Sequence, residues 1–299
     1  MSHLRSPFHV VALLAATAVL AACGPTASVA RPHTIGVAAG FYPLAYAAAQ
    51  IGAGHVTVHD LGRPGVDAHD IDLTPQDMVT VSQARVVFYE KAFQPAVDAA
   101  VAAQASTRGF DVAPSADLTL VDAGGEGVNG HFWLDPVRFA GVAEAMGAEL
   151  ARVDPANASA YAANTARFVD RLHAIDRAFT TGLASCASRD LVTGHGAWSY
   201  FAMRFHLTAR AIAGLSPEAE PDAQTLGTLT AYVRDHHIRT VFAEPLTSPA
   251  LTDTLAQETG ARVATLDPAE GLSAASLGTT YEEIMRNDLD ALRAGLSCR

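Results

Sequence analysis

The feature that most constrains the fold is a long amphipathic stretch in the middle of the chain. Within residues 156–184, apolar side chains recur at helical spacing, at Tyr161, Phe168, Leu172, Ile175, Phe179 and Leu183. A helix of about 27 residues spans about 40 Å. The spacing therefore predicts one long helix, and a helix of this length is well suited to link two lobes.

Short strand patterns alternate with helical patterns on both sides of this stretch. The strands predicted before it are 34–38, 55–61, 85–89 and 118–122, and those after it are 191–193, 207–213, 240–243 and 262–266. Alternation of this kind, without hairpin signals, is typical of parallel sheets in α/β folds. The predicted organisation is an N-terminal α/β lobe at 34–155, a linking helix at 156–185 and a C-terminal α/β lobe at 186–299.

The first residues have the pattern of an export signal. The apolar run 10–22 is too short to span a bilayer comfortably, and it leads into LAAC, which ends at Cys23. LAAC resembles a bacterial lipobox, in which the cysteine becomes the lipid-carrying N-terminus. We predict a signal peptide at 1–22, a lipid-anchored tether at 23–33, and a periplasmic or cell-surface location. The alternative is an ordinary cleaved signal followed by an unmodified Cys23.

Charge and cysteine content limit the partners and the compartment. The formal net charge is −11, which argues against nucleic acid as a partner. After Cys23 only Cys186 and Cys298 remain. In an exported protein, two remaining cysteines indicate a disulfide more often than a metal site. We therefore predict that Cys186 pairs with Cys298.

Four candidate metal ligands lie in loops after predicted strands or in turns before helices. They are His69, His131, His195 and Asp267. In open α/β folds such loops gather at the carboxyl ends of the strands, where ligands bind. Three imidazoles and one carboxylate suit tetrahedral zinc, and imidazoles suit zinc, copper, iron or nickel better than magnesium or calcium. Four protein ligands leave no position for an activated water, which favours binding over catalysis.

The segments around these residues resemble the zinc and manganese (cluster A-I) solute-binding proteins of ABC uptake transporters. GVDAH ends at His69 and is followed by the helix start TPQD; HFWLDP begins at His131; HGAWSYF begins at His195; and LDP contains Asp267. The resemblance covers nearly the whole chain after the signal, with the motifs in the family's order. It implies two Rossmann-like α/β lobes with parallel sheets, joined by one long rigid helix, and a metal site between the lobes.

The resemblance also implies a function. Manganese-type members usually carry glutamate at the position of His195, so histidine there favours Zn²⁺ over Mn²⁺ or Fe²⁺. The expected role is extracytoplasmic binding of zinc and its delivery to an ABC permease, by a monomer that a periplasmic metallochaperone could load and that has no enzymatic activity. Two alternatives stay open: a zinc-dependent hydrolase with Asp267 as the base, and a surface adhesin with a structural metal.

Other residues near the ligands are predicted to support the site. Asp67 and Glu244 are candidates for orienting imidazoles, and Trp133 and Trp198 are expected to shield the metal by packing. The glycine-rich segment 122–130 is short and lacks histidine, unlike the His-rich loop of many zinc-type members. We expect it to fold over the metal on loading. Because protons compete for three imidazoles, zinc binding should weaken below about pH 6.5.

Overall fold

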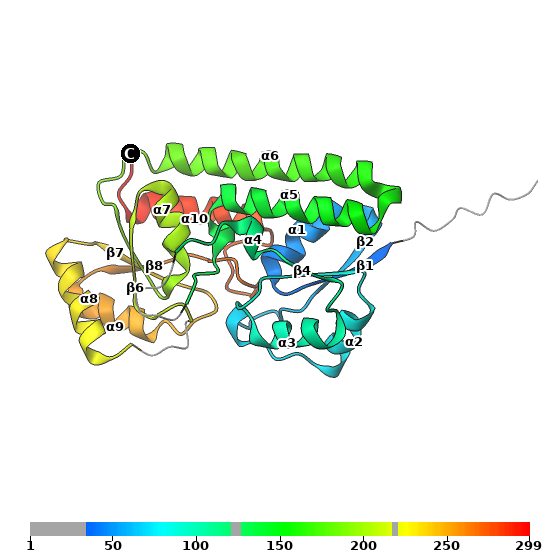
Figure 1. Ribbon diagram of the computed structural model, residues 1–299. Helices are drawn as coiled ribbons and strands as arrows, with labels where there is room; N and C mark the ends of the chain where they lie inside the picture. The colour runs from blue at the N-terminus through cyan, green and yellow to red at the C-terminus, as the bar shows by residue number, and fades with distance from the viewer. Residues whose placement is uncertain (1–33, 121–126, 217–220) are drawn as a thin grey trace, which may run out of the picture. The chain divides into compact units, whose positions relative to one another are not determined.

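The computed structural model describes residues 34–120, 127–216 and 221–299 (Figure 1). The predicted signal peptide, Cys23, the tether and most of the glycine-rich segment lie outside these ranges. Among the helices that the structure describes, none combines the length and the apolar character needed to cross a membrane.

Two four-stranded parallel sheets form the centres of two lobes. The N-lobe sheet has the order β2-β1-β3-β4, and the C-lobe sheet has the order β6-β5-β7-β8. The strands are β1 (Ile35–Ala39), β2 (Val56–Asp60), β3 (Val86–Tyr89), β4 (Gly109–Asp111), β5 (Asp190–Thr193), β6 (Thr208–Ala211), β7 (Thr240–Ala243) and β8 (Arg262–Thr265). Both sheets place their first strand second in the order, so the two lobes are wound alike. The predicted parallel-sheet α/β lobes are confirmed.

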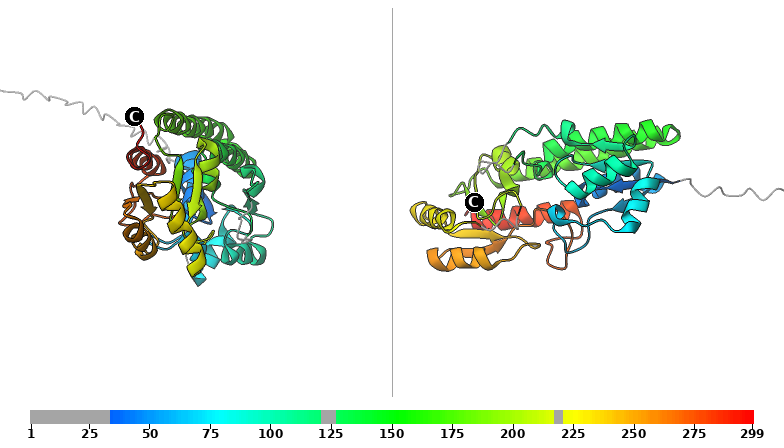
Figure 2. Two further views of the ribbon diagram at one scale, coloured as in Figure 1. Left: turned by 90° about the vertical axis from the view of Figure 1, so that its left-hand side faces the viewer. Right: turned by 60° about the horizontal axis from the view of Figure 1, so that its bottom comes forward.

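Helices cover both faces of each sheet. They are α1 (Tyr42–Gly52), α2 (Pro75–Gln83), α3 (Pro95–Gln104), α4 (Ala113–Ala116), α5 (Pro136–Val153), α6 (Ala158–Gly182), α7 (Ser199–Phe205), α8 (Ala223–Asp235), α9 (Ala250–Thr259) and α10 (Tyr281–Gly295). The pairs α2–α3 and α8–α9 each pack on the outer face of one sheet through a separate apolar cluster. The remaining helices share one apolar core that runs through both lobes, and α5 and α6 lie side by side in all views (Figure 2).

The long helix α6 packs against both lobes, as the sequence predicted. Near its middle, Phe168 contacts Phe139 of α5 at a ring distance of 5.6 Å. Near its end, Phe179 contacts Phe201 and Phe205 of α7 at 5.0 and 5.3 Å. All five rings are buried. A single rigid helix therefore anchors aromatic side chains in both lobes, which limits how far the lobes can separate.

One predicted strand is placed wrongly. The fourth strand of the N-lobe is β4, whereas Leu118–Leu120 are irregular and the rest of the predicted strand lies outside the described residues. The sequence of β4 is GFD, with Phe110 as its only apolar residue, so it carries almost no periodic signal. Pairing with β3 in the register Phe88↔Phe110 gives it strand structure.

The disulfide predicted between Cys186 and Cys298 is present in the structure. It joins the residues that follow α10 to the segment that enters β5, a sequence separation of 112 residues. Backbone hydrogen bonds from Ala187 N to Ser297 O and from Ser188 N to Leu296 O flank it. The end of the chain is thereby fixed to the start of the C-lobe.

The helix that follows the His69 loop begins with a complete capping box. Thr74 Oγ1 accepts from Asp77 N at 3.1 Å, and Asp77 Oδ2 accepts from Thr74 N at 2.8 Å. We expect Thr74→Ala to lower the free energy of unfolding by about 0.5–2 kcal/mol, as measured by urea denaturation. The control is Thr228→Ala, on the exposed face of α8. Equal effects of the two changes would contradict a role for the cap.

Candidate metal centre

Three histidines and one glutamate converge where the two lobes meet. His69 lies in a short 3-10 turn after β2, His131 shortly before α5, His195 two residues after β5, and Glu270 in the loop after β8. Three of the four therefore follow the carboxyl ends of parallel strands, which is where α/β folds place their ligands. Among the described residues, these four form the group whose donor atoms all lie within 4.8 Å of one another.

The donor atoms are spaced like the corners of a small tetrahedron. His131 Nε2 lies 3.1 Å from His69 Nε2 and 3.4 Å from His195 Nε2. Glu270 Oε1 lies 3.0 Å from both His131 Nε2 and His195 Nε2. A tetrahedron with metal–ligand distances of about 2.0–2.1 Å has edges of about 3.3 Å. Four of the six donor separations lie within about 0.3 Å of that edge, and all six are within 4.8 Å, so these atoms can close around a zinc ion with small shifts.

Asp267, the acidic ligand expected from the sequence, is not in this group. Its Oδ1 accepts a hydrogen bond from Ala269 N at 2.9 Å, and its Oδ2 accepts one from Leu277 N at 3.0 Å. These bonds close the loop that carries Glu270 and turn the Asp267 carboxylate toward the loop's own backbone. The structure instead brings Glu270, three residues further along, to the three imidazoles.

Polar partners orient two of the imidazoles. Glu244 Oε2 accepts from His195 Nδ1 at 2.5 Å, and Glu244 Oε1 accepts from Trp198 Nε1 at 3.3 Å. Asn129 Oδ1 lies 3.0 Å from His131 Nδ1. In the neutral form of each imidazole, a proton on Nδ1 leaves the Nε2 lone pair free to bind a metal. The sequence suggested Glu244 for such a role and gave no signal for Asn129.

Asp67 and Trp133 lie beside the proposed ligands, and each makes a hydrogen bond to a backbone group. Asp67 Oδ1 accepts from the backbone N of His69 at 2.9 Å. Burial, and next to it the charge of Glu270, raise the pKa of Asp67 to about 8. A protonated Asp67 can donate to the otherwise unpartnered Glu270 Oε2. The Trp133 ring lies 5.2 Å from that of His131, and its Nε1 donates to Pro268 O at 2.7 Å.

The electrostatics divide the three histidines into two kinds. Burial, followed by the neighbouring His131, lowers the pKa of His69 to about 3, and burial also lowers the pKa of His131. Burial would lower the pKa of His195 as well, but Glu244 and Glu270 outweigh it and hold that pKa well above its ordinary value. In the metal-free protein at neutral pH, the favoured form of His195 is therefore the imidazolium, protonated on both ring nitrogens, between two carboxylates.

A match to a known protein family identifies the kind of protein in which these four residues lie. Residues 37–295 match the family described as "Zinc-uptake complex component A periplasmic". The chain belongs to this ZnuA family. It is therefore the extracytoplasmic solute-binding component of a zinc uptake system, of the kind that works with an ABC permease, and zinc is the ion it binds.

Individual ZnuA-family relatives agree with this assignment. The chain is 28% identical to the high-affinity zinc uptake system protein ZnuA of Bacillus subtilis, over 93% of this chain and 94% of that protein. It is 28% identical to the zinc-binding lipoprotein AdcA of Streptococcus pneumoniae, over 85% of this chain and 54% of AdcA. The Zn(II)-bound AdcA structure superposes with a TM-score of 0.75 and 27% identity, covering 88% of this chain and 58% of that one.

A third relative bears on the adhesin alternative. The laminin-binding protein Lmb of Streptococcus agalactiae, described as bifunctional with adhesin and metal transporting activity, superposes with a TM-score of 0.77. The identity is 25%, over 88% of this chain and 99% of Lmb. The ZnuA-family fold is thus found in proteins with one or both activities.

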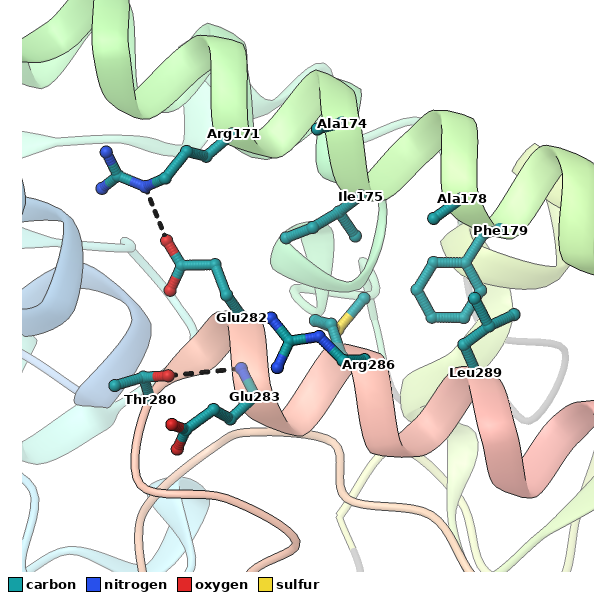
Figure 3. A pocket seen from close by; sticks show the side chains of 11 residues that line it. Arg171, Ala174, Ile175, Ala178, Phe179, Thr280, Glu282, Glu283, Arg286 and Leu289 are labelled. Atoms are coloured by element: carbon teal, nitrogen blue, oxygen red, sulfur yellow. Dashed lines mark hydrogen bonds and ion pairs between the residues drawn. The ribbon is translucent and has the colours of Figure 1, made fainter.

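A separate pocket lies between α6 and α10, and it shares no residue with the four converging donors. Its volume is about 480 Å³. Its walls are largely apolar, with Ile175, Phe179 and Leu289 among them, and the ion pair between Arg171 and Glu282 lies at one end (Figure 3). Its lining includes two carboxylates, Glu282 and Glu283, but no histidine, so it lacks the mixed donor set of the candidate metal centre.

The partner of His195 should have a measurable effect on zinc binding by this ZnuA-family chain. We expect Glu244→Ala to weaken zinc binding by about 10–100-fold, because the imidazole loses both its orientation and a charge that increases its basicity. The assay is competitive titration against a chelator. Glu144→Ala, which removes the same charge from an exposed position on α5, should bind like the parent. Parent-like binding by Glu244→Ala would show that Glu244 does not act through His195.

Proposed function

We propose that His69, His131, His195 and Glu270 together hold one zinc ion between the lobes, and that the chain passes this ion to the permease of an ABC importer. The observation that carries the proposal is the set of four donor separations, 3.0, 3.0, 3.1 and 3.4 Å. They lie close to the length expected for four of the six edges of a tetrahedral zinc site. A set of three imidazoles and one carboxylate also suits zinc better than it suits magnesium, calcium or manganese.

A carrier role fits this site better than hydrolysis. If all four donors bind zinc, no position remains for the activated water that a zinc hydrolase needs. Asp267, which a hydrolase would use as its base, has both carboxylate oxygens engaged by backbone N–H groups. We therefore propose that the chain is not an enzyme and acts as a monomeric carrier. An adhesive activity like that described for Lmb would leave this site unchanged.

We further propose how the chain is attached and loaded. Cleavage after residue 22 and lipidation of Cys23 would anchor it to the membrane through the tether 23–33. The LAAC pattern and the description of the relative AdcA as a lipoprotein support this. The lobe boundaries at 34–155, 156–185 and 186–299 belong to the same proposal. A periplasmic metallochaperone could deliver zinc, and nucleic acid plays no part.

The test is zinc-limited growth of a bacterium that lacks its own zinc-binding component. The full chain is expressed together with its permease, and free zinc is lowered with a chelator. The parent chain and His173→Ala, a change on α6 away from the site, should restore growth. His131→Ala and Glu270→Gln should not restore it. Growth restored equally by all four chains would refute transport through this site.

A further inference from the structure

Asn129 makes hydrogen bonds to both lobes. It is 1% exposed and lies two residues before His131. Its Oδ1 accepts from His131 N at 2.9 Å and lies 3.0 Å from His131 Nδ1. Its Nδ2 donates across the lobe boundary to Gly196 O at 2.9 Å. Gly196 directly follows His195, so one side chain connects the loops of two proposed ligands.

The hydrogen-bond network fixes the orientation of this amide. If the amide were rotated by 180°, its NH₂ group would face the backbone N–H of His131, and its oxygen would face the carbonyl of Gly196. Both contacts would be repulsive and would leave buried polar groups unpaired. The observed orientation also requires the proton of His131 to be on Nδ1, because Oδ1 can only accept. His131 Nε2 is therefore available to a metal.

A second cross-lobe bond lies on the other side of His131. Trp133 Nε1 donates to Pro268 O at 2.7 Å, in the C-lobe loop that carries Glu270. Tyr281 of α10 donates to Trp133 O at 2.5 Å. The side chains of Trp133 and Tyr281 are fully buried, as is that of the neighbouring His131. The segment 129–133 is thus fastened to each of the two C-lobe loops that supply a donor.

We propose that the cross-lobe bonds of Asn129 and Trp133 hold the three buried donors His131, His195 and Glu270 together, and that they set the rate at which zinc leaves. The inference rests on the proposed zinc site. Parting the lobes at this point requires the Asn129–Gly196 and Trp133–Pro268 bonds to break. The side chains of Asn129 and Trp133 are buried, and hydrogen bonds are stronger in such surroundings than in water. Asn129 is a positioning residue that acts through His131 and through the His195 loop.

Asn129→Asp separates the two roles of this side chain. A carboxylate still accepts from His131 N and Nδ1, but it cannot donate to Gly196 O. Its added negative charge near the metal would by itself slow the departure of a cation. If the bond to Gly196 matters, zinc should nevertheless leave faster. Asn129→Leu removes both roles. Trp133→Phe removes the donor to Pro268 and part of the buried ring volume, while an aromatic ring remains.

The experiment measures the rate of zinc release into excess chelator by stopped-flow, with the visible spectrum of the Co²⁺-substituted protein as a second readout. We expect Asn129→Asp and Trp133→Phe to release zinc about tenfold faster than the parent, with the parent's Co²⁺ spectrum. Asn129→Leu should both alter that spectrum and weaken zinc binding by about 10–100-fold. The charge control is Gln76→Glu, on an exposed position of α2, which should match the parent.

Two results would overturn the inference. Parent rates of release in both Asn129→Asp and Trp133→Phe would show that the cross-lobe bonds do not hold zinc. A parent-like spectrum and affinity in Asn129→Leu would show that Asn129 does not position His131. Failure of the proposed zinc site itself would look different, because the parent protein would then bind no zinc tightly.

Discussion

Replacing Glu270 by glutamine is expected to weaken zinc binding by more than about 100-fold, beyond the range typical of changes to residues that only support a ligand. Glu270 is 2% exposed, and its Oε1 lies 3.0 Å from the Nε2 atoms of His131 and His195. A neutral amide there would leave a divalent cation in a buried site without an anionic donor. The assay is competitive titration with a chelator of known affinity.

Asp267→Asn is the matched comparison, because it makes the same chemical change three residues earlier. The Asp267 carboxylate holds the loop through Ala269 N and Leu277 N. We expect a loss of about tenfold or less, because the loop loosens while the donor remains. If the two variants were reversed, with Asp267→Asn losing zinc and Glu270→Gln keeping it, the fourth donor would be Asp267 after all.

The second large effect concerns pH. We expect zinc binding at pH 7 to release at least about one proton per zinc ion, and the affinity to fall by at least about tenfold per pH unit as the pH decreases. Burial would lower the pKa of His195, but Glu244 and Glu270 hold it well above its ordinary value. His195 must therefore lose a proton before its Nε2 can bind zinc. From pH 7.5 to 5.5 the loss of affinity should reach about 100-fold.

The direction of this dependence follows from competition at one atom. A raised pKa means that protons occupy His195 already at neutral pH, so lower pH favours the metal-free form. The pKa of His69, at about 3, keeps that ring neutral over the same range, and burial lowers the pKa of His131 and so favours its neutral form. The dependence should therefore begin above pH 6.5, in contrast to the expectation from three ordinary imidazoles. The zinc affinity should also fall less steeply with decreasing pH than it would if three protons were released per zinc ion.

Asp67 provides an internal check on the proton count. Its pKa is raised to about 8 by burial and by the charge of Glu270. Zinc neutralises that charge, so part of a second proton should be released from Asp67. Calorimetry in buffers of different protonation enthalpy measures the total, and Asp67→Asn should reduce it toward one. Proton release that is absent at pH 7 and appears only below pH 6.5 would contradict the raised pKa of His195.

The periodic parts of the fold could be predicted from the sequence. The apolar spacing of Phe168, Leu172 and Phe179 predicted α6, because each of these side chains packs into the core. Alternating strands and helices predicted two parallel sheets. The strand β4 was missed because three residues with a single apolar side chain carry no period. Its strand structure comes from pairing with β3, which is a tertiary effect.

The candidate site could be predicted only in part. Each histidine lies in a segment with a distinctive neighbourhood, so the sequence singled out all three. The choice between Asp267 and Glu270 was different, because both carboxylates lie in the same loop. It is decided by backbone bonds to Asp267 and by a turn at Ala269, whose φ is +54°. The role of Asn129 exists only where the two lobes meet, so no pattern within one segment could reveal it.

X-ray absorption spectroscopy at the zinc K-edge shows directly whether three histidines and Glu270 surround the zinc ion. The sample is the soluble form, residues 24–299, loaded with one equivalent of zinc. We expect four nitrogen and oxygen donors at about 2.0–2.2 Å, with the outer-shell scattering of three imidazoles. Glu270→Gln should change the first shell, and Asp267→Asn should leave it unchanged. A six-coordinate shell, or scattering from fewer than three imidazoles, would contradict the three-histidine, one-glutamate site.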